Sequence, residues 1–251
     1  MIAIGKPELA IVITLCNRPK YTARVLEALA ACDGADGVPV FLMVEPVNDE
    51  VLRIAKDFRQ PRELYMYTKR VGCNINTAYA LAKGFETADR VLALEDDTVP
   101  GRDLIRFTNW ALGEYEDDKT VFSVCGYQRT RPEELHRTNE VVRENWFTPW
   151  GWATWRDRFE SVQMTWPARD DDMSWDTMIH RGKLGDRCEI RPVVARVQNI
   201  GGELGLHVPS VEWHEKHHLN PHWIESTDSP PIGLYHEVNP TREQLRATYP
   251  C

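Results

Sequence analysis

Apolar and polar residues alternate with two different periods along the first half of the chain. Short, nearly continuous apolar runs predict strands, and apolar residues three or four positions apart predict helices. The expected strands are 9–15, 38–44, 64–67, 90–94 and 121–124, and the expected helices are 21–31, 50–58, 76–86 and 103–115. Strands that alternate with helices in this way indicate an α/β domain with a mostly parallel sheet between helices.

From Gly126 onward the regular period is lost. Proline, tryptophan and charged residues interrupt the apolar runs, which stay as short as the one at 193–197. We therefore expect 126–251 to form loops and short elements over the ligand-binding edge of the sheet, within the same single domain as 1–125.

Three consecutive acids, Glu95, Asp96 and Asp97, follow the predicted strand 90–94. A buried strand would carry them to the carboxyl edge of the sheet, where open α/β sheets bind ligands. Such carboxylates need a cationic partner, and a hard divalent ion that also holds substrate phosphates supplies one. A helix N-cap at Asp97 or Thr98 would account for one acid but not for three. The pattern therefore favours a metal site.

Polar residues also end or follow the neighbouring strands. Asn17 and Arg18 follow the first strand, Glu45 follows the second, and Asn74 precedes the third helix. These groups can reach the same crevice as the acids and contact a nucleotide, although a helix cap is an equally good interpretation of Asn17. The chain has neither GxGxxG nor GxxxxGK[ST], which removes the main support for a dinucleotide-binding or P-loop protein.

Four tryptophans lie within residues 146–155. Flat indole faces around a glycine turn, as at Trp150, Gly151 and Trp152, suit a sugar ring, and a purely structural aromatic cluster is the alternative for some of them. Asp176 follows Trp175, and a partly desolvated carboxylate there could serve as a general base, whereas an isolated acid is more often a surface residue or a cap.

A glycine-rich stretch at 198–208 contains His207 near its end. Its backbone could fold over a ligand and bring His207 to the metal, although a single histidine is more often packed or exposed to solvent. The histidines at 214, 217, 218 and 222 lack a nearby cysteine or a clear helical pair, which argues against zinc.

Composition narrows the class of protein. The 251 residues include 30 Lys and Arg against 38 Asp and Glu, a net charge of -8, which disfavours a nucleic acid partner without excluding it. The six cysteines form no CxxC pair, so buried free thiols in a reducing compartment are expected. The sequence shows no leader and no membrane span, and we expect a soluble, cytoplasmic protein.

Several of these segments together carry a resemblance to a known family. They are 17–19, 95–97, 150–155, 175–176, and 199–201 followed by His207. In this order, from Ile11 to about His207, the chain resembles nucleotide-sugar-dependent glycosyltransferases of the GT-A fold, especially bacterial relatives of the N-acetylglucosaminyltransferase that initiates complex N-glycan branching.

The resemblance implies a GT-A type, Rossmann-like sheet in which 1–125 is the nucleotide-sugar-binding half and 126–251 is the acceptor-side and lid half. It implies that Asp97 binds Mn²⁺ or Mg²⁺ bridging the donor diphosphate. Glu95 and Asp96 would belong to the nucleotide-sugar site, with Asp96 near the ribose or the sugar.

The resemblance also assigns roles around the acids. Asn17, Arg18 and Glu45 would border the nucleotide, and Asp176 would deprotonate the acceptor hydroxyl, which implies inversion. Residues 175–178 are Trp-Asp-Thr-Met, where the eukaryotic relative has a segment that resembles Trp-Asp-Asp-Trp. The register of the catalytic acid therefore stays open, and so does the choice between inversion and retention.

The expected activity is metal-dependent transfer of a hexosyl or N-acetylhexosaminyl group from a nucleoside-diphosphate sugar, with a UDP-sugar favoured. The acceptor could be a glycan, a lipid-linked glycan, a protein or a modified nucleobase. A sugar-nucleotidyltransferase is one alternative, but the glycine-rich basic loop usual near its start is missing. A non-catalytic nucleotide-sugar or glycan-binding module is the other.

Overall fold

The computed structural model describes residues 7–59, 62–129, 138–169, 173–203, 208–220, 223–225, 228 and 233–238. Within them the strands are β1 Leu9–Leu15, β2 Val40–Val44, β3 Arg62–Met66, β4 Arg90–Glu95, β5 Thr98–Pro100, β6 Val121–Cys125, β7 Glu140–Glu144, β8 Trp152–Trp155, β9 Cys188–Pro192, β10 Val197–Asn199 and β11 His236–Glu237. The helices are α1 Pro19–Ala30, α2 Asp49–Asp57, α3 Cys73–Thr87, α4 Leu104–Glu114, α5 Arg156–Gln163, α6 Trp175–Met178 and α7 Val211–His217, and a π-helical turn, η2 Ile179–Lys183, continues α6.

A nine-stranded sheet in the order β11-β7-β9-β6-β8-β4-β1-β2-β3 organises the molecule, and β5 and β10 form a small second sheet. The parallel block β4-β1-β2-β3 comes from the first half of the chain, as the apolar runs predicted. Its register pairs Ile11 with both Val40 and Leu92, and the side chains of these three residues are buried. The α/β class and the mostly parallel sheet of the first half are confirmed.

The second half of the chain contains short elements, as expected, but they also build the sheet. Strand β8 runs antiparallel between β4 and β6, and β9, β7 and β11 extend the sheet beyond β6. The two-residue period did not indicate β8, because all four of its residues are buried and polar alternation is absent. The sheet therefore joins both halves of the chain.

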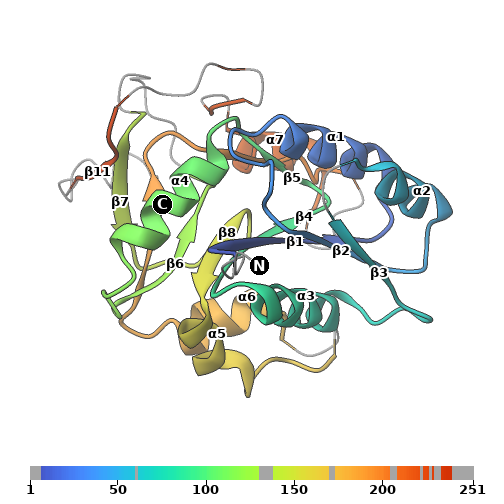
Figure 1. Ribbon diagram of the computed structural model, residues 1–251, viewed down its shortest axis with the longest axis horizontal. Helices are drawn as coiled ribbons and strands as arrows, with labels where there is room; N and C mark the ends of the chain where they lie inside the picture. Colours follow the sequence, from blue (N-terminus) through green and yellow to red (C-terminus); the bar gives the residue numbers. More distant parts are fainter. Residues whose placement is uncertain are drawn as a thin grey trace, which may run out of the picture.

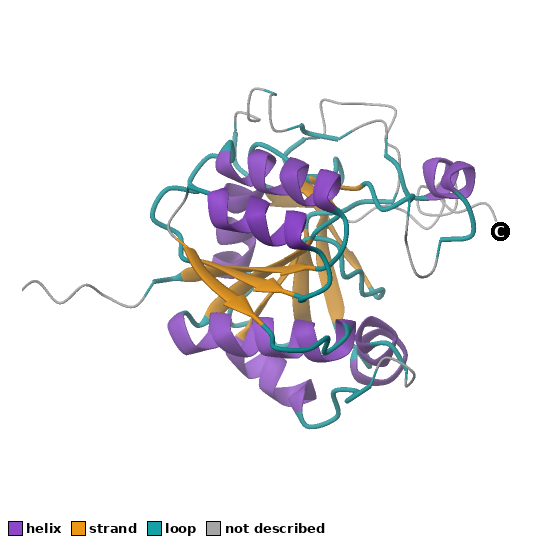
Figure 2. Cartoon of the chain, turned by 90° about the vertical axis from the view of Figure 1, so that its right-hand side faces the viewer, coloured by secondary structure: helices purple, strands orange, loops and turns teal. Residues whose placement is uncertain are grey.

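Helices cover both faces of the sheet (Figure 1). Helices α1, α2 and α4 lie on one face, and α3, α5 and α6 lie on the other, an arrangement that is also visible from the side in Figure 2. The indole of Trp155 donates to Leu112 O of α4, at 3.0 Å, while Phe85 of α3 stacks on Phe159 of α5, with ring centroids 5.2 Å apart. None of the helices within the described ranges is long and apolar enough to cross a membrane.

Candidate active site

The three acids lie where β4 ends and the chain turns back. The hydroxyl of Thr98 accepts from the amide N–H of Glu95 at 2.7 Å, which closes the turn between β4 and β5. Asp96 and Asp97 are 2% and 6% exposed. An apolar strand followed by a tight turn thus carries two carboxylates into the protein at the carboxyl edge of the sheet.

Arg18 from the end of β1 lies against both carboxylates. Its Nε donates to Asp96 Oδ1 at 3.0 Å, and its Nη1 donates to Asp97 Oδ2 at 2.6 Å. The parallel pairing of Thr14 with Glu95 brings these two strand ends together, as the sequence predicted. Burial lowers the pKa of Arg18, but the charges of Asp97 and Asp96 outweigh it and raise this pKa. The arginine therefore stays charged and neutralises the acids.

Burial has the opposite effect on the carboxyl groups. It raises the pKa of Asp96 despite the counteracting charge of Arg18. It also raises the pKa of Glu95 well above its usual value, and the neighbouring charge of Asp97 adds to that effect. A closely packed acidic site of this kind favours a ligand that brings positive charge.

Asp97 has one carboxylate oxygen that meets the requirement for a divalent ion. Its Oδ1 is buried and has no hydrogen-bond partner among the described residues, while Oδ2 is held by Arg18. Both Asp96 oxygens have donors, from Arg18 and from Cys16 N. Mg²⁺-like ions often take only one or two carboxylates and complete their shell with water and substrate phosphates, so Asp97 fits this ligand role.

The protein ligands that the structure offers are few. In the described part of the chain no group of three or more His, Cys, Asp or Glu side chains is placed to hold a metal. His207, the second predicted ligand, lies outside the described residues. Ion binding through Asp97 would therefore depend on ligands from outside the described residues.

The turn after β10 packs directly on Asp97. Ile200 N donates to Asp97 O at 2.8 Å, and a Cβ at position 201 would lie 2.1 Å from Asp97 Oδ2, so only glycine fits there. Asn199 Oδ1 accepts from Gly201 N at 3.0 Å and lies 2.8 Å from His214 Nε2. The sequence did not indicate this role for His214, since its partner is far away along the chain.

Glu45 and Asn74 hold the loops that surround the crevice. The Glu45 carboxylate is buried and accepts from Val71 N at 3.0 Å and Gly72 N at 2.7 Å. Asn74 Oδ1 accepts from Trp175 N at 3.0 Å, which ties α3 to the start of α6. The predicted contacts of Glu45 and Asn74 with a nucleotide stay predictions. Asn17, the remaining residue of this set, is exposed at the end of β1.

Asp176 lies in the first turn of α6 and is partly buried. Its charge contributes to the raised pKa of Glu95, after burial and the charge of Asp97. It also opposes the lowering of the His180 pKa, which burial dominates. The charge of the candidate base therefore acts both on the acid tip of β4 and on His180.

The tryptophans divide into buried and accessible side chains. Trp152 is 1% exposed, and its ring stacks on Trp175 with centroids 5.6 Å apart. This placement revises the interpretation of Trp152, because an indole enclosed in the core offers no face to a sugar. Trp150 is half-buried and lies edge to face with His218, at 4.6 Å. The pairing of Ala93 with Trp152 places Trp150 and Gly151 beside the carboxyl end of β4.

Gly151 is fixed by its surroundings. It has φ 65°, and a Cβ there would lie 2.5 Å from Val197 Cγ2. Its carbonyl oxygen accepts from Gly126 N at 2.8 Å. The turn that presents Trp150 therefore requires glycine for both its conformation and its close packing.

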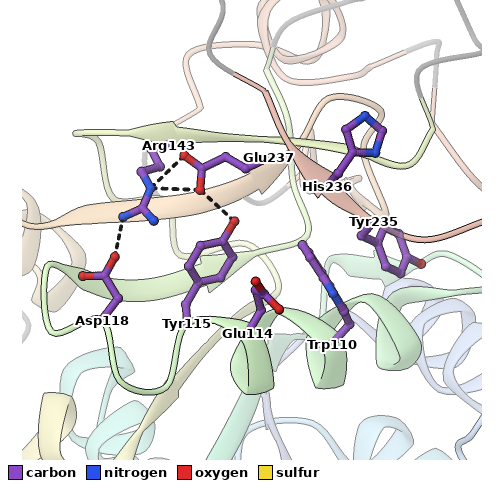
Figure 3. Close-up of a pocket in the computed structure, with 8 residues that line it drawn as sticks. All are labelled: Trp110, Glu114, Tyr115, Asp118, Arg143, Tyr235, His236 and Glu237. Carbon is purple, nitrogen blue, oxygen red and sulfur yellow. Dashed lines mark hydrogen bonds and ion pairs between the residues drawn. The ribbon is translucent and has the colours of Figure 1, made fainter.

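A separate groove lies at the other end of the sheet, between α4, β7 and β11 (Figure 3). Its residues are Trp110, Glu114, Tyr115, Asp118, Arg143, Tyr235, His236 and Glu237. The Arg143 guanidinium bridges Asp118 and Glu237, at 2.7 and 2.9 Å. None of the predicted site residues that the structure describes lines this groove, and its ion pairs attach β11 to the edge of the sheet.

Comparison with known proteins identifies the family of this chain. Residues 7–184 match the family model for glycosyltransferase like family 2. The chain belongs to this family. The family is one of glycosyltransferases. No curated protein matches the chain.

Solved structures agree on the fold. TarS 1–349 from S. aureus aligns with a TM-score of 0.57 and 12% identity, over 76% of this chain and 60% of that chain. A second S. aureus TarS structure aligns with a TM-score of 0.56 and 11% identity, over 76% of this chain and 36% of that one. The chain thus shares its fold, which is of the GT-A type, with these structures, and it spans less than two thirds of the length of either neighbour.

Proposed function

We propose that this glycosyltransferase moves a hexosyl or N-acetylhexosaminyl group from a UDP-sugar to an acceptor hydroxyl, with inversion and with the help of Mn²⁺ or Mg²⁺. The observation that supports this most is the arrangement at the end of β4. There Asp97 keeps one buried oxygen without a hydrogen-bond partner among the described residues, Arg18 lies beside it, and the charge of Asp176 contributes to the raised pKa of Glu95.

The donor side of the proposal depends on Arg18 and Asp97. Arg18 supplies a fixed positive charge at the strand end where the diphosphate would lie, and Asp97 Oδ1 is available to an ion. When bound, a divalent ion offsets the charge that develops on the leaving diphosphate. The turn at Gly201 keeps side chains away from this point.

The acceptor side depends on Asp176. A partly buried carboxylate near other acids is a suitable proton acceptor, and it would take the proton from the hydroxyl as that oxygen attacks the anomeric carbon. Attack from the side opposite the diphosphate inverts the configuration. Retention would instead need the acceptor to attack on the same face as the leaving group, or two successive inversions through a covalent intermediate.

Donor hydrolysis tests this function without knowledge of the acceptor. The full chain is incubated with UDP-glucose, UDP-galactose, UDP-N-acetylglucosamine or UDP-N-acetylgalactosamine and Mn²⁺, and released UDP is measured by anion-exchange chromatography. We expect UDP release with one of these donors and its loss in EDTA. Proton NMR of the first sugar released from an α-linked donor should show the β anomer.

Two other outcomes would identify the alternatives. Donor binding by calorimetry without any UDP release would indicate a nucleotide-sugar-binding module. Release of pyrophosphate from a nucleoside triphosphate and a sugar 1-phosphate would indicate a nucleotidyltransferase.

A further inference from the structure

Trp146 differs from the other tryptophans of the segment 146–155. Its side chain is 48% exposed, whereas Trp152 and Trp155 are buried in the core. Its indole packs against the imidazole of His180, with ring centroids 3.9 Å apart. A half-exposed indole that is held in place by a neighbouring ring is available to a ligand, because it presents a flat apolar face for stacking.

We propose that Trp146 and His180 form a platform on which a sugar ring of the acceptor rests, next to Asp176. This inference rests on the proposed function and extends it, since it assigns the acceptor a saccharide and a binding surface. It also moves the predicted sugar contact from the buried Trp152 to the exposed Trp146.

The platform is close to the candidate base. His180 follows Asp176 by four residues along the continuous helical run of α6 and η2, so the two side chains are about one turn apart on similar faces. The charge of Asp176 acts on His180. The imidazole Nδ1 lies 3.4 Å from the amide N–H of Phe147, the residue after Trp146.

A buried charge network fixes the main chain on which Trp146 stands. Arg191 Nη2 donates to Trp146 O at 2.5 Å and to Thr148 Oγ1 at 2.7 Å. Glu189 Oε1 accepts from Thr148 N at 3.1 Å and pairs with Arg191 at 2.8 Å. Arg191 and Glu189 are both buried. Burying such charges costs free energy, which is offset only when the ion pair and its hydrogen bonds have good geometry.

The core restrains the same segment, 146–148, a second time through the ring of Phe147. The ring of Phe147 lies edge to face with Trp152 at 5.0 Å and with Trp175 at 5.9 Å. The main chain of 146–148 is therefore held on both sides, while the indole of Trp146 points out of the core. A pre-ordered aromatic surface binds a ligand with little loss of conformational entropy.

The chemistry of the platform matches a sugar ring. Its indole can cover the C–H face of a pyranose, while His180 and Asp176 offer polar partners to hydroxyl groups. A purely aliphatic ligand would leave both polar groups desolvated without partners. We therefore assign the platform to a saccharide acceptor in preference to a lipid chain.

Transfer kinetics test the platform. The probes are the methyl glycosides of glucose, galactose, N-acetylglucosamine and N-acetylgalactosamine, added to the donor that the protein hydrolyses. We expect Trp146→Ala to raise the KM for the stimulating glycoside about ten-fold, because the stacking face is lost. The glycoside KM of Trp146→Phe should lie between those of the wild type and of Trp146→Ala. The KM for the donor and hydrolysis to water should not change.

Trp110→Ala is the matched control, since Trp110 lies on α4 in the distant groove (Figure 3). It should keep the wild-type KM for the glycoside, and melting curves check that each variant is folded. An unchanged glycoside KM in Trp146→Ala would overturn the platform. An equal rise in donor KM would overturn it too, because it would indicate a general disturbance of the site.

A binding experiment separates this inference from the proposed function. Protein labelled with 5-fluorotryptophan is titrated with the same glycosides, and the Trp146 fluorine resonance is assigned from Trp146→Phe. We expect this resonance to shift while that of Trp110 does not, even if no UDP is released by the wild type. Failure of every glycoside to move the Trp146 resonance would refute the platform, whatever the outcome of the hydrolysis assay.

Discussion

The two oxygens of the Asp97 carboxylate have different surroundings, and this difference defines the candidate site at the residue scale. Oδ2 is bound by Arg18, which offsets the negative charge, while Oδ1 is buried without a partner among the described residues. An unpaired buried oxygen costs free energy unless a ligand completes it. Asp97 is therefore the residue at which loss of a single side chain should be most informative.

We predict that Asp97→Ala raises the donor KM and lowers kcat, because the ion and the diphosphate lose a direct partner. The fold should survive, since Arg18 keeps its contact with Asp96. UDP release at several Mn²⁺ concentrations measures the effect. Asp118→Ala, an acid of the distant groove, serves as control and should retain wild-type activity. Full turnover of Asp97→Ala in EDTA would contradict the metal assignment.

Asp176→Asn should reduce kcat by about two to four orders of magnitude, the usual contribution of a general base, while donor binding stays intact. The amide keeps the shape of the side chain but cannot accept the proton. Transfer rates and calorimetry of donor binding are measured separately. Asp186→Asn, at an exposed acid beyond η2, is the control.

The rival acids at 170–172 lie outside the described residues, and the same substitution at each position completes the test. Near-normal transfer by Asp176→Asn, with a large loss at one of the other three, would move the base to that residue.

At the scale of elements, Glu189 and Arg191 of β9 form a buried ion pair that supports the segment carrying Trp146. Arg191 also pairs with Glu144 of β7 at 2.9 Å. The network thus joins two strands and the segment that carries Trp146. Such an arrangement is sensitive to removal of one partner, since the other charge stays buried.

Arg191→Leu is therefore expected to lower the free energy of unfolding by about 3–5 kcal/mol. The double variant Glu189→Gln with Arg191→Leu should lose less than the sum of the two single changes, because no unpaired charge remains at 189. Urea denaturation of the four proteins gives the coupling. Strict additivity would show that the two residues act independently.

Helix α7 provides a pH-dependent element. Burial lowers the pKa of His218 from 6.5 to about 4, and the nearby His214 adds to this effect. Its Nδ1 is buried and has no partner in the described ranges, so the folded protein favours the neutral ring. As the pH falls from 6.5 towards 4, the unfolded chain binds a proton that the folded protein rejects, and stability decreases.

His218→Phe should remove this component, because the ring stays and the titration is lost. When the pH is lowered from 8 to 5, the free energy of unfolding should decrease less in the variant than in the wild type. Urea denaturation at both pH values measures this difference. An equal pH dependence of the two proteins would show that His218 does not contribute to it.

At the scale of the whole molecule, the sheet makes the two halves of the chain interdependent. Strand β8 from the second half lies between β4 and β6 of the first half. Without β8, the edges of β4 and β6 would expose unpaired backbone groups and the apolar surface that its four buried residues cover.

We therefore expect the fragment 1–125 not to fold cooperatively, although it contains most of the predicted donor site. Thermal denaturation followed by circular dichroism should show no sharp transition, in contrast to the full chain. A fragment that melts sharply and binds UDP would instead show that the first half is an independent domain.

Much of the fold and part of the site could be predicted from local sequence patterns. The strand 90–94 and the helix 103–115 correspond closely to β4 and α4, because their apolar periods are local and their burial is decided by helix or strand geometry. Strand ends in a parallel sheet meet at one edge, so the approach of Arg18 to the acids also followed from order along the chain.

The remaining features depended on contacts between residues far apart in the sequence. Trp146 and Trp152 have the same chemistry and lie six positions apart, yet one is exposed and the other is enclosed by Trp175 and Phe147. His214 supports the turn over Asp97 through Asn199, fifteen positions earlier. The sequence by itself determined the alternating strands and helices of the first half and where the acids lie, since these follow from short-range periodicity. Only the tertiary structure decided which aromatic face is open and which histidine has a partner, because burial and long-range hydrogen bonds arise when distant segments pack together.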